Sequence, residues 1–170
     1  MEKPRKNNSI KTKVKKIKLL LLDVDGVLTD GRIVYTSDGT ELKFFDAHDG
    51  YGFSKALKAG LLLGIISGRS SPMVTKRAKE FFIQEVHQDV ENKILVYEML
   101  KKKYTLADEH IAYVGDDIPD LGVLRAVGFS ACPSDAMDEV KKNVDFIASR
   151  EGGRGAVREV IDILLARKNK

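Results

Sequence analysis

Short apolar runs that alternate with amphipathic stretches are the feature that most restricts how this chain can fold. The runs are shorter than an average helix of roughly 11 residues. Most of them contain no charged side chain, which is typical of strands buried on both faces of a parallel sheet. We therefore expect strands at residues 17–22, 61–67, 81–86, 111–115, 129–132 and 146–148.

The amphipathic stretches between these runs fit helices. Gly60 is suited to end one helix, because glycine readily adopts the backbone of a C-cap, and Pro72 is suited to the first turn of another. The expected helices cover residues 51–59, 72–80, 93–103, 119–127, 135–142 and 155–167. The alternation of strand and helix predicts an α/β fold, with a Rossmann-like parallel sheet flanked by helices.

One segment interrupts this alternation. Residues 31–45 contain two β-prone arms around Ser37-Asp38-Gly39, which is a hairpin signal. The segment follows the first expected strand, where a plain α/β unit would begin a helix. We expect a small β-hairpin flap to be inserted there.

The composition indicates one domain that folds without a disulfide or a cysteine zinc cluster. A chain of 170 residues can bury a full hydrophobic core, and Cys132 is its single cysteine. No apolar run reaches the roughly 18 residues of a membrane span. The first ten residues lack the apolar region of a signal peptide. We expect a cytoplasmic protein that does not enter a membrane.

The charge is concentrated at the amino terminus. Residues 1–18 hold eight basic residues and one acid, whereas the whole chain has a net charge of +4, so the rest is net acidic. We expect residues 1–16 to form a basic, flexible tail and residues 17–170 to form the domain. A basic tail could bind nucleic acid, but this one has no aromatic residue to stack on bases, and a solvated tail is the favoured interpretation.

Polar side chains follow three of the expected strands. Ligands in open α/β sheets bind outside the carboxyl ends of the strands, so these side chains should converge at one edge. The first cluster is Asp23 and Asp25, the second is Ser67 and Arg69, and the third is Asp116, Asp117 and Asp120.

The residue types in these clusters suit phosphoryl transfer. Asp23 and Asp25 are two residues apart, so in an extended chain they face the same side. Together with Asp116 they would repel one another unless a hard cation such as Mg²⁺ lay between them. Lys93 can supply a fixed positive charge to a bound anion, and Ser67 can donate a hydrogen bond to it. A carboxylate nucleophile beside these groups indicates an aspartyl-phosphate mechanism.

Each of these residues also has an ordinary structural interpretation. A lone Asp-x-Asp is usually a turn signal, Ser67 could be a cap, and Lys93 could be a solvated lysine at a helix start. Asp116 and Asp117 could cap the turn before Pro119. The order of the three clusters and the lysine along the chain favours the catalytic interpretation.

The motifs resemble those of the haloacid dehalogenase superfamily of phosphohydrolases. LLLLDVDGVLTDG (19–31), IISGR (65–69), Lys93 and YVGDDIPD (113–120) are similar to its four motifs in order. The resemblance implies that Asp23 is the nucleophile and that Asp25 is the general acid and base. It further implies that Mg²⁺ is held by the Asp23 carboxylate, the Asp25 backbone carbonyl and Asp116. Ser67 and Lys93 would then bind the phosphoryl group, with Asp117 and Asp120 as supporting residues.

The spacing of the motifs leaves no room for a cap domain. Capless members of the superfamily use a neighbouring subunit as a lid, so the resemblance implies self-association, with a homotetramer expected and the flap as the place of assembly. DGYGF (49–53) and EGGRGAVREV (151–160) resemble the capless phosphatases that act on sugar acid phosphates. The paired glycines of the second stretch could start the last helix or form a hinge that carries Arg154 to a neighbouring site.

The resemblance also implies a set of substrate contacts. Two cations near the site suit a substrate with both a carboxylate and a phosphate. His48 and Ser54 stand where this group often has arginine, which bears on the identity of the sugar acid. The implied contacts are Asp25, Asp46, Ala47, His48, Asp49, Gly50, Ser67, Arg69, Arg77 and Lys93.

Other functions stay open from the sequence. The substrate could be the phosphate of an eight-carbon or a nine-carbon sugar acid, or the enzyme could be a promiscuous sugar phosphatase. A non-enzymatic phosphate-receiver module also gathers acids and a lysine at a sheet edge. Such receivers lack a residue like Asp25, two positions after the phosphorylated aspartate, that would hydrolyse the phosphoenzyme.

Overall fold

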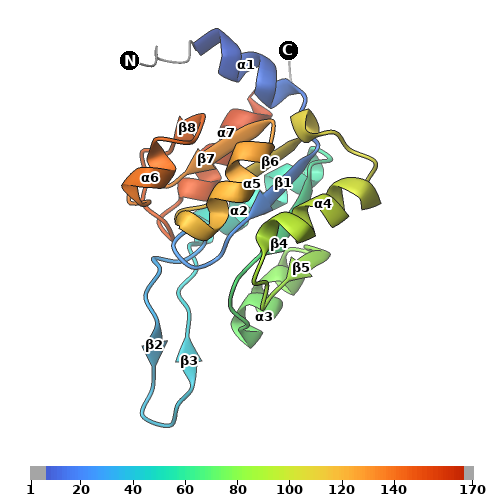
Figure 1. Ribbon diagram of the computed structural model, residues 1–170. Helices are drawn as coiled ribbons and strands as arrows, with labels where there is room; N and C mark the ends of the chain where they lie inside the picture. Colours follow the sequence, from blue (N-terminus) through green and yellow to red (C-terminus); the bar gives the residue numbers. More distant parts are fainter. Residues whose placement is uncertain (1–6, 167–170) are drawn as a thin grey trace.

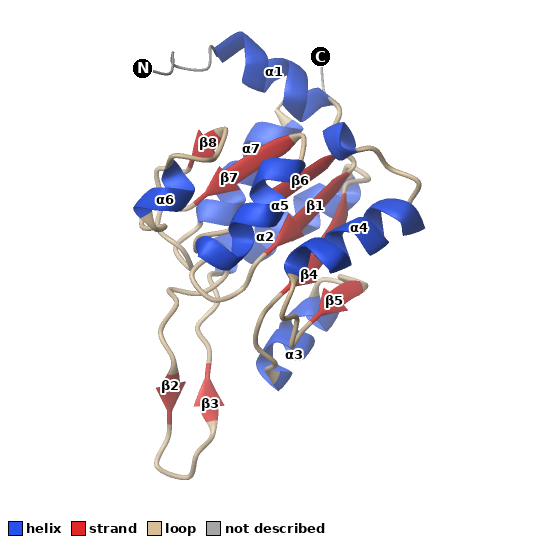
Figure 2. Ribbon diagram, in the orientation of Figure 1, coloured by secondary structure: helices blue, strands red, loops and turns tan. Residues whose placement is uncertain are grey.

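The computed structural model describes residues 7–166 and contains a six-stranded parallel sheet in the order β5-β4-β1-β6-β7-β8 (Figures 1 and 2). Parallel pairing aligns Leu19 of the central strand with Leu62 on one side and Ile111 on the other. The strands are β1 (Leu19–Leu22), β4 (Leu62–Ile66), β5 (Glu85–His87), β6 (Ile111–Val114), β7 (Phe129–Cys132) and β8 (Phe146–Ile147). The predicted fold class is therefore confirmed.

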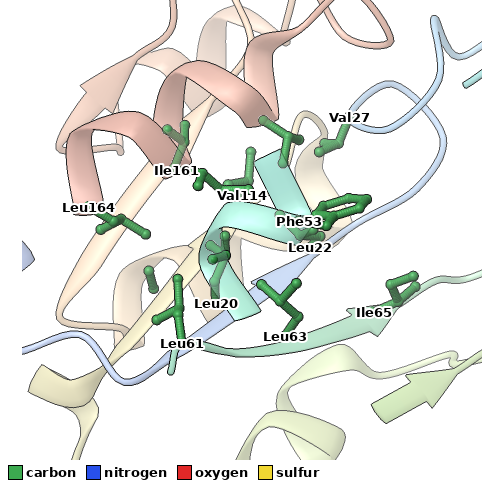
Figure 3. Close-up of a cluster of buried hydrophobic side chains, with 14 of the residues drawn as sticks. Leu20, Leu22, Val27, Phe53, Leu61, Leu63, Ile65, Val114, Ile161 and Leu164 are labelled. Atoms are coloured by element: carbon green, nitrogen blue, oxygen red, sulfur yellow. The ribbon is translucent and has the colours of Figure 1, made fainter. Parts of the chain in front are cut away.

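Helices cover both faces of the sheet, which gives the fold two hydrophobic cores. Alternate side chains of β1 point to opposite faces of the sheet. Because both faces are covered, all four leucines of β1 are buried. Leu20 and Leu22 enter one core together with Phe53 and Leu164, which Figure 3 shows in close-up. Leu19 and Leu21 enter the other core. The helices are α2 (Ala47–Lys58), α3 (Pro72–Glu80), α4 (Lys93–Lys103), α5 (Leu121–Ala126), α6 (Asp138–Lys141) and α7 (Ala156–Leu165).

The flap is an antiparallel hairpin that projects away from the sheet (Figure 1). Its strands are β2 (Val34–Tyr35) and β3 (Glu41–Leu42). The turn closes with a hydrogen bond from the Gly39 main-chain N–H to the Thr36 carbonyl oxygen, and Gly39 has a φ of 84° that favours glycine. The expected flap is present, and no second domain interrupts the described chain.

The amino-terminal region differs from the expected tail. Helix α1 (Asn7–Lys15) lies within the stretch assigned to the tail, and Val14 is completely buried in the core that α7 also lines. The Lys13 ammonium lies 2.7 Å from the carboxylate of Asp145. The folded unit therefore begins before residue 17, because an apolar stripe on this basic segment packs against the domain. Residues 1–6 of the expected tail lie outside the described residues.

Several element boundaries also differ from the sequence-based prediction. The second helix begins at Ala47 rather than residue 51, because Asp46 caps it by accepting a hydrogen bond from the His48 N–H. The strand expected at 81–86 starts only at Glu85, since Phe82 has a φ of 53° and cannot continue a strand. The helix expected at 119–127 is split into a 3₁₀ turn, η2 (Ile118–Asp120), and α5.

None of the helices in the described chain has the length and apolar character needed to cross a bilayer.

Candidate active site

The polar clusters predicted from the sequence meet at the carboxyl edge of the sheet. Asp23 follows β1, Ser67 follows β4 and Asp116 lies just beyond β6, and these three strands are neighbours. Asp23 is fixed by a hydrogen bond from its N–H to the Val114 carbonyl oxygen, at 3.0 Å. One carboxylate oxygen from each of Asp23, Asp116 and Asp120 lies within 4.8 Å of the others. Parallel pairing thus brings Asp23 close to two acids, Asp116 and Asp120, that come from a distant part of the sequence.

Lys93 joins two of these acids. It is the first residue of α4, and its buried ammonium lies 2.5 Å from Asp23 Oδ1 and 2.7 Å from Asp120 Oδ1. Burial opposes the charge of this ammonium, but Asp23 and Asp120 outweigh burial and hold the Lys93 pKa above its ordinary value. Lys93 therefore stays charged beside Asp23, which is the state that could bind an anion.

Asp120 is positioned to support the site rather than to bind a metal ion. Its Oδ1 also accepts a hydrogen bond from the Tyr113 hydroxyl at 2.6 Å. Its Oδ2 accepts hydrogen bonds from the main-chain N–H groups of Asp116 and Asp117, at 3.0 and 3.2 Å. Both oxygens are occupied, so Asp120 orients Lys93 and the loop that carries Asp116. Asp117 itself is exposed and caps the following turn through the Ile118 N–H.

Asp23 and Asp116 have the properties of ligands for a hard cation. Burial, together with the charge of Asp120, raises the pKa of Asp23 to about 6. Burial and the charge of Asp23 raise the pKa of Asp116 to about 8. No side chain among the described residues donates a hydrogen bond to the Asp116 carboxylate. A divalent cation between the two would relieve the cost of keeping both ionised, so the donor set fits Mg²⁺.

Gly26 gives Asp116 the space that it needs. The backbone of Gly26 has a φ of 92°, and a Cβ atom there would lie 2.1 Å from Asp116 Oδ2. The glycine of the first motif is thus required both for its backbone conformation and for close approach to a carboxylate.

Asp25 contacts two cations, and one of them was not identified from the sequence. The Lys43 ammonium, on the flap, pairs with Asp25 Oδ1, and the Arg69 guanidinium lies 3.9 Å from Asp25 Oδ2. Glu41 of the flap accepts a hydrogen bond from Arg69 at 2.8 Å. The sequence did contain a signal for Lys43: side chains alternate along the second arm of the hairpin, which puts Glu41 and Lys43 on the same face.

Ser67 is buried at the end of β4. Its Oγ accepts a hydrogen bond from the Arg69 N–H at 3.2 Å, and its own N–H donates to the His87 carbonyl oxygen at 2.8 Å. Both contacts fix the loop that presents Arg69 to Asp25. The hydroxyl hydrogen stays available for a bound anion.

The residues from 46 to 50 have structural roles at the start of α2. Asp46 caps the helix, Ala47 is its first residue, and His48 is exposed, with its Nδ1 2.8 Å from Asp46 Oδ1. Asp49 is buried and accepts a hydrogen bond from the Arg158 N–H at 2.7 Å. Gly50 lets the helix approach Phe81, because a Cβ would lie 2.5 Å from that ring. Their assignment as substrate contacts stays a prediction.

Arg77 makes a hydrogen bond and a cation–π contact within the same chain. Its guanidinium donates a hydrogen bond to the Asp46 carbonyl oxygen at 3.2 Å and lies over the Phe81 ring, 4.5 Å from the centroid. A substrate anion would therefore compete with existing partners of Arg77. These two contacts give Arg77 a structural role, and its substrate contact stays a prediction.

The paired glycines before α7 are packed rather than free. The Gly153 N–H donates a hydrogen bond to the Val27 carbonyl oxygen at 3.0 Å. A Cβ on Gly152 would lie 1.9 Å from the Gly26 carbonyl oxygen. In this structure, the glycines bring the turn before α7 against the loop that follows Asp25, and Arg154 lies on that turn.

A buried lysine between carboxylates at the carboxyl edge of a parallel sheet suits a phosphate hydrolase, and comparison with known proteins agrees with that class. The model of the family described as haloacid dehalogenase-like hydrolase matches residues 75–161. The chain is 42% identical over 161 residues to the 3-deoxy-D-manno-octulosonate 8-phosphate phosphatase KdsC of Salmonella typhi. That alignment covers 95% of this chain and 86% of that protein. The chain belongs to the haloacid dehalogenase-like hydrolase family.

Solved structures agree with this membership. A 3-deoxy-D-manno-octulosonate 8-phosphate phosphatase from Moraxella catarrhalis, in complex with magnesium ion, phosphate ion and KDO, superposes with a TM-score of 0.94 at 42% identity. The match covers 96% of this chain and 94% of that one. The cobalt-bound phosphatase from Haemophilus influenzae matches with a TM-score of 0.89 at 36% identity, over 93% and 92% of the two chains.

Proposed function

We propose that this protein is a magnesium-dependent phosphatase. It hydrolyses 3-deoxy-D-manno-octulosonate 8-phosphate to the free sugar acid and phosphate, a step in lipopolysaccharide biosynthesis. The observation that carries the proposal is the buried contact of Lys93 with Asp23 and Asp120, next to Asp116, at the carboxyl edge of the sheet. The 42% identity to the Salmonella typhi phosphatase over 95% of this chain supports the choice of substrate.

The proposed reaction has two steps. A carboxylate oxygen of Asp23 attacks the phosphorus, the bond from phosphorus to the sugar oxygen breaks, and Asp25 delivers a proton to that oxygen. Asp25 then takes a proton from a water molecule, whose oxygen attacks the phosphorus of the aspartyl-phosphate and releases phosphate and free Asp23. Lys93 and Ser67 hold the phosphoryl oxygens throughout.

The metal site is part of the proposal. Mg²⁺ would be held by the carboxylates of Asp23 and Asp116 and by the backbone carbonyl of Asp25, and it would neutralise charge on the phosphoryl group. Asp120 keeps Lys93 and the Asp116 loop in place through its four hydrogen bonds.

The test is phosphate release with Mg²⁺ from 3-deoxy-D-manno-octulosonate 8-phosphate, a nine-carbon sugar acid phosphate and a panel of neutral sugar phosphates. We expect a strong preference for the eight-carbon substrate. Even activity across the panel would replace this proposal with a promiscuous sugar phosphatase. The Asp23→Asn variant is the control and should be folded and inactive. An aspartyl-phosphate in the wild type that lasts for hours would indicate a receiver module instead.

We further propose that the protein forms a homotetramer in which a neighbouring copy covers the site. The flap supports this proposal, because its outward side chains Leu42 and Phe44 are 39% and 64% exposed on a two-stranded ribbon that cannot bury them alone. Phe44→Ser should lower the molar mass measured by light scattering and lower activity with it. A fully active monomer would contradict this assembly.

The proposed place of action is the cytoplasm. The one cysteine, Cys132, is a buried free thiol, which suits a reducing compartment. Fractionation of the source cells, with activity recovered outside the cytoplasmic fraction, would overturn the location.

We also propose that the chain forms a single domain that includes α1.

A further inference from the structure

The flap presents two different faces. Along its second arm, Glu41 and Lys43 face the catalytic edge of the sheet, whereas Leu42 and Phe44 face outward. Side chains alternate along an extended chain, so a shift of one residue would exchange the two faces. The arm is therefore polar toward its own active site and apolar on the other side.

The side chain of Lys43 is buried although the residue belongs to a projecting hairpin. Its side chain is 2% exposed, and its ammonium pairs with Asp25 and lies 3.6 Å from Glu41 Oε1. A buried ammonium costs free energy unless carboxylates compensate it, so its position depends on these two partners. A lysine that only made the flap soluble would extend into water.

The two oxygens of Asp25 face different cations. Oδ1 pairs with Lys43 of the flap, and Oδ2 lies 3.9 Å from Arg69, which follows β4. The Nη1 of Arg69 is buried and has no hydrogen-bond partner within the described chain. Glu41 connects the two cations by accepting a hydrogen bond from Arg69. The orientation of the Asp25 carboxylate is thus set by one group from the loop after β4 and one from the flap.

We propose that Lys43 is a positioning residue for the reaction. It holds the Asp25 carboxylate in the direction of the leaving oxygen, and in this way the acid step depends on how the flap is docked. General acid catalysis requires hydrogen-bond reach to that oxygen, and a displacement of about 1 Å can cost roughly a hundredfold in rate. The inference rests on the proposed phosphatase chemistry but not on the identity of the sugar.

Leaving-group dependence separates this role from a structural one. The experiment compares Lys43→Met with the wild type on 3-deoxy-D-manno-octulosonate 8-phosphate, which has a poor leaving group, and on p-nitrophenyl phosphate, which has a good one. We expect kcat on the sugar phosphate to fall roughly tenfold to a hundredfold and kcat on the aryl phosphate to change by less than about threefold. Lys43→Arg should recover most of the loss. Lys58→Met, at an exposed lysine, is the matched control and should behave as wild type.

A double-mutant cycle tests whether Lys43 acts through Asp25. In an Asp25→Asn background, Lys43→Met should cause little further loss on the sugar phosphate, because the group that it positions is already absent. An equal loss in both backgrounds would overturn the inference. So would an equal loss on both substrates, or a change confined to KM for the sugar acid, which would make Lys43 a substrate contact.

The two proposals fail in different ways. If the wild type hydrolyses p-nitrophenyl phosphate but not the octulosonate phosphate, the proposed substrate is wrong. The cycle is then carried out with an alkyl phosphate that the enzyme does hydrolyse, and it still decides the role of Lys43. Thermal unfolding of each variant verifies that it is folded. If Lys43→Met does not fold, Lys43→Gln, which keeps a hydrogen-bond donor but has no charge, replaces it and should show the same dependence on the leaving group.

Discussion

The carboxylate of Asp49 on α2 accepts a hydrogen bond from the main-chain N–H of Arg158 on α7, at 2.7 Å, across 109 positions of sequence. The residue before α7 is Gly155, which has no side chain to cap the helix. Asp49 therefore supplies the missing acceptor from a different helix. Its other oxygen, Oδ2, is buried without a hydrogen-bond partner in the described part of the chain.

The first prediction concerns the pH dependence that Asp49 gives to stability. Burial raises its pKa to about 6, above the ordinary value near 3.9. The folded state is therefore favoured while Asp49 is protonated, and this contribution is lost as the pH rises from about 4 to above 6. Asp49→Asn keeps an oxygen acceptor but cannot ionise, so its stability relative to wild type should rise over that range by roughly 2–3 kcal/mol.

Urea unfolding at a series of pH values, with Mg²⁺ present, measures this difference. Asp162→Asn is a suitable control, because Asp162 lies on α7, the helix that Asp49 caps, and its pKa is lowered. Burial alone would raise the pKa of Asp162, but hydrogen bonds from Lys55 and Arg158 outweigh burial. A difference between Asp49→Asn and wild type that is constant from pH 4 to pH 7 would contradict the prediction.

The second prediction concerns Mg²⁺ and the paired acids. Burial raises the pKa of Asp23 to about 6 and the pKa of Asp116 to about 8, and repulsion from neighbouring acids adds to both increases. Without metal, the stability that their protonation provides should be lost as the pH rises from about 4 to 8. Mg²⁺ replaces those protons, so the increase in Tm on adding it should be larger at pH 8 than at pH 6.

Calorimetry with EDTA or Mg²⁺ at both pH values tests this dependence. Asp116→Asn removes one ligand and one repelling charge. It should be more stable than metal-free wild type at pH 8, and it should show little response to Mg²⁺. An undiminished response in that variant would exclude Asp116 as a ligand.

The third prediction compares two glycines with similar backbones. Gly26 has a φ of 92° and Gly39 has a φ of 84°, so alanine is strained by a similar amount at either position, about 1 kcal/mol. At Gly26 the new Cβ would also collide with Asp116, whereas at Gly39 it has nothing within 4 Å. Gly26→Ala should therefore lose phosphatase activity and the Mg²⁺ effect on Tm, whereas Gly39→Ala should keep both. Equal activity in the two variants would contradict the prediction, because it would show that the loop around Gly26 can move away from Asp116.

The fourth prediction concerns the buried charge of Lys93. Lys93→Met leaves Asp23 and Asp120 buried without their cation, which should cost about 3–5 kcal/mol in the free energy of unfolding. Adding Asp120→Asn removes one of the uncompensated charges and should restore part of that stability without restoring activity. Guanidinium unfolding of the single and double variants measures the recovery. If the double variant is less stable than Lys93→Met, charge compensation is not the cause.

Much of the fold and the centre of the site follow from local pattern. Apolar runs without charge become central parallel strands, because only such strands can be buried on both faces. Residues directly after those strands must meet at the carboxyl edge, and Asp23 and Asp116 do so. Lys93 reaches the same edge from the start of α4. The structure of segments that pack against distant parts of the chain was predicted less well. Helix α1 was expected to be a tail, since nothing local reveals that Val14 packs beside α7.

Local sequence pattern was enough to predict the parallel α/β sheet, the flap and the acidic edge, because the period of the apolar residues and the polar residues at strand ends are local properties. The pairing of Lys43 with Asp25 and the capping of α7 by Asp49 depend instead on tertiary contacts. In both cases a charged side chain is compensated by a group from another element. The free energy of burying a charge depends on which partner the fold brings within contact distance, and no local pattern specifies that partner.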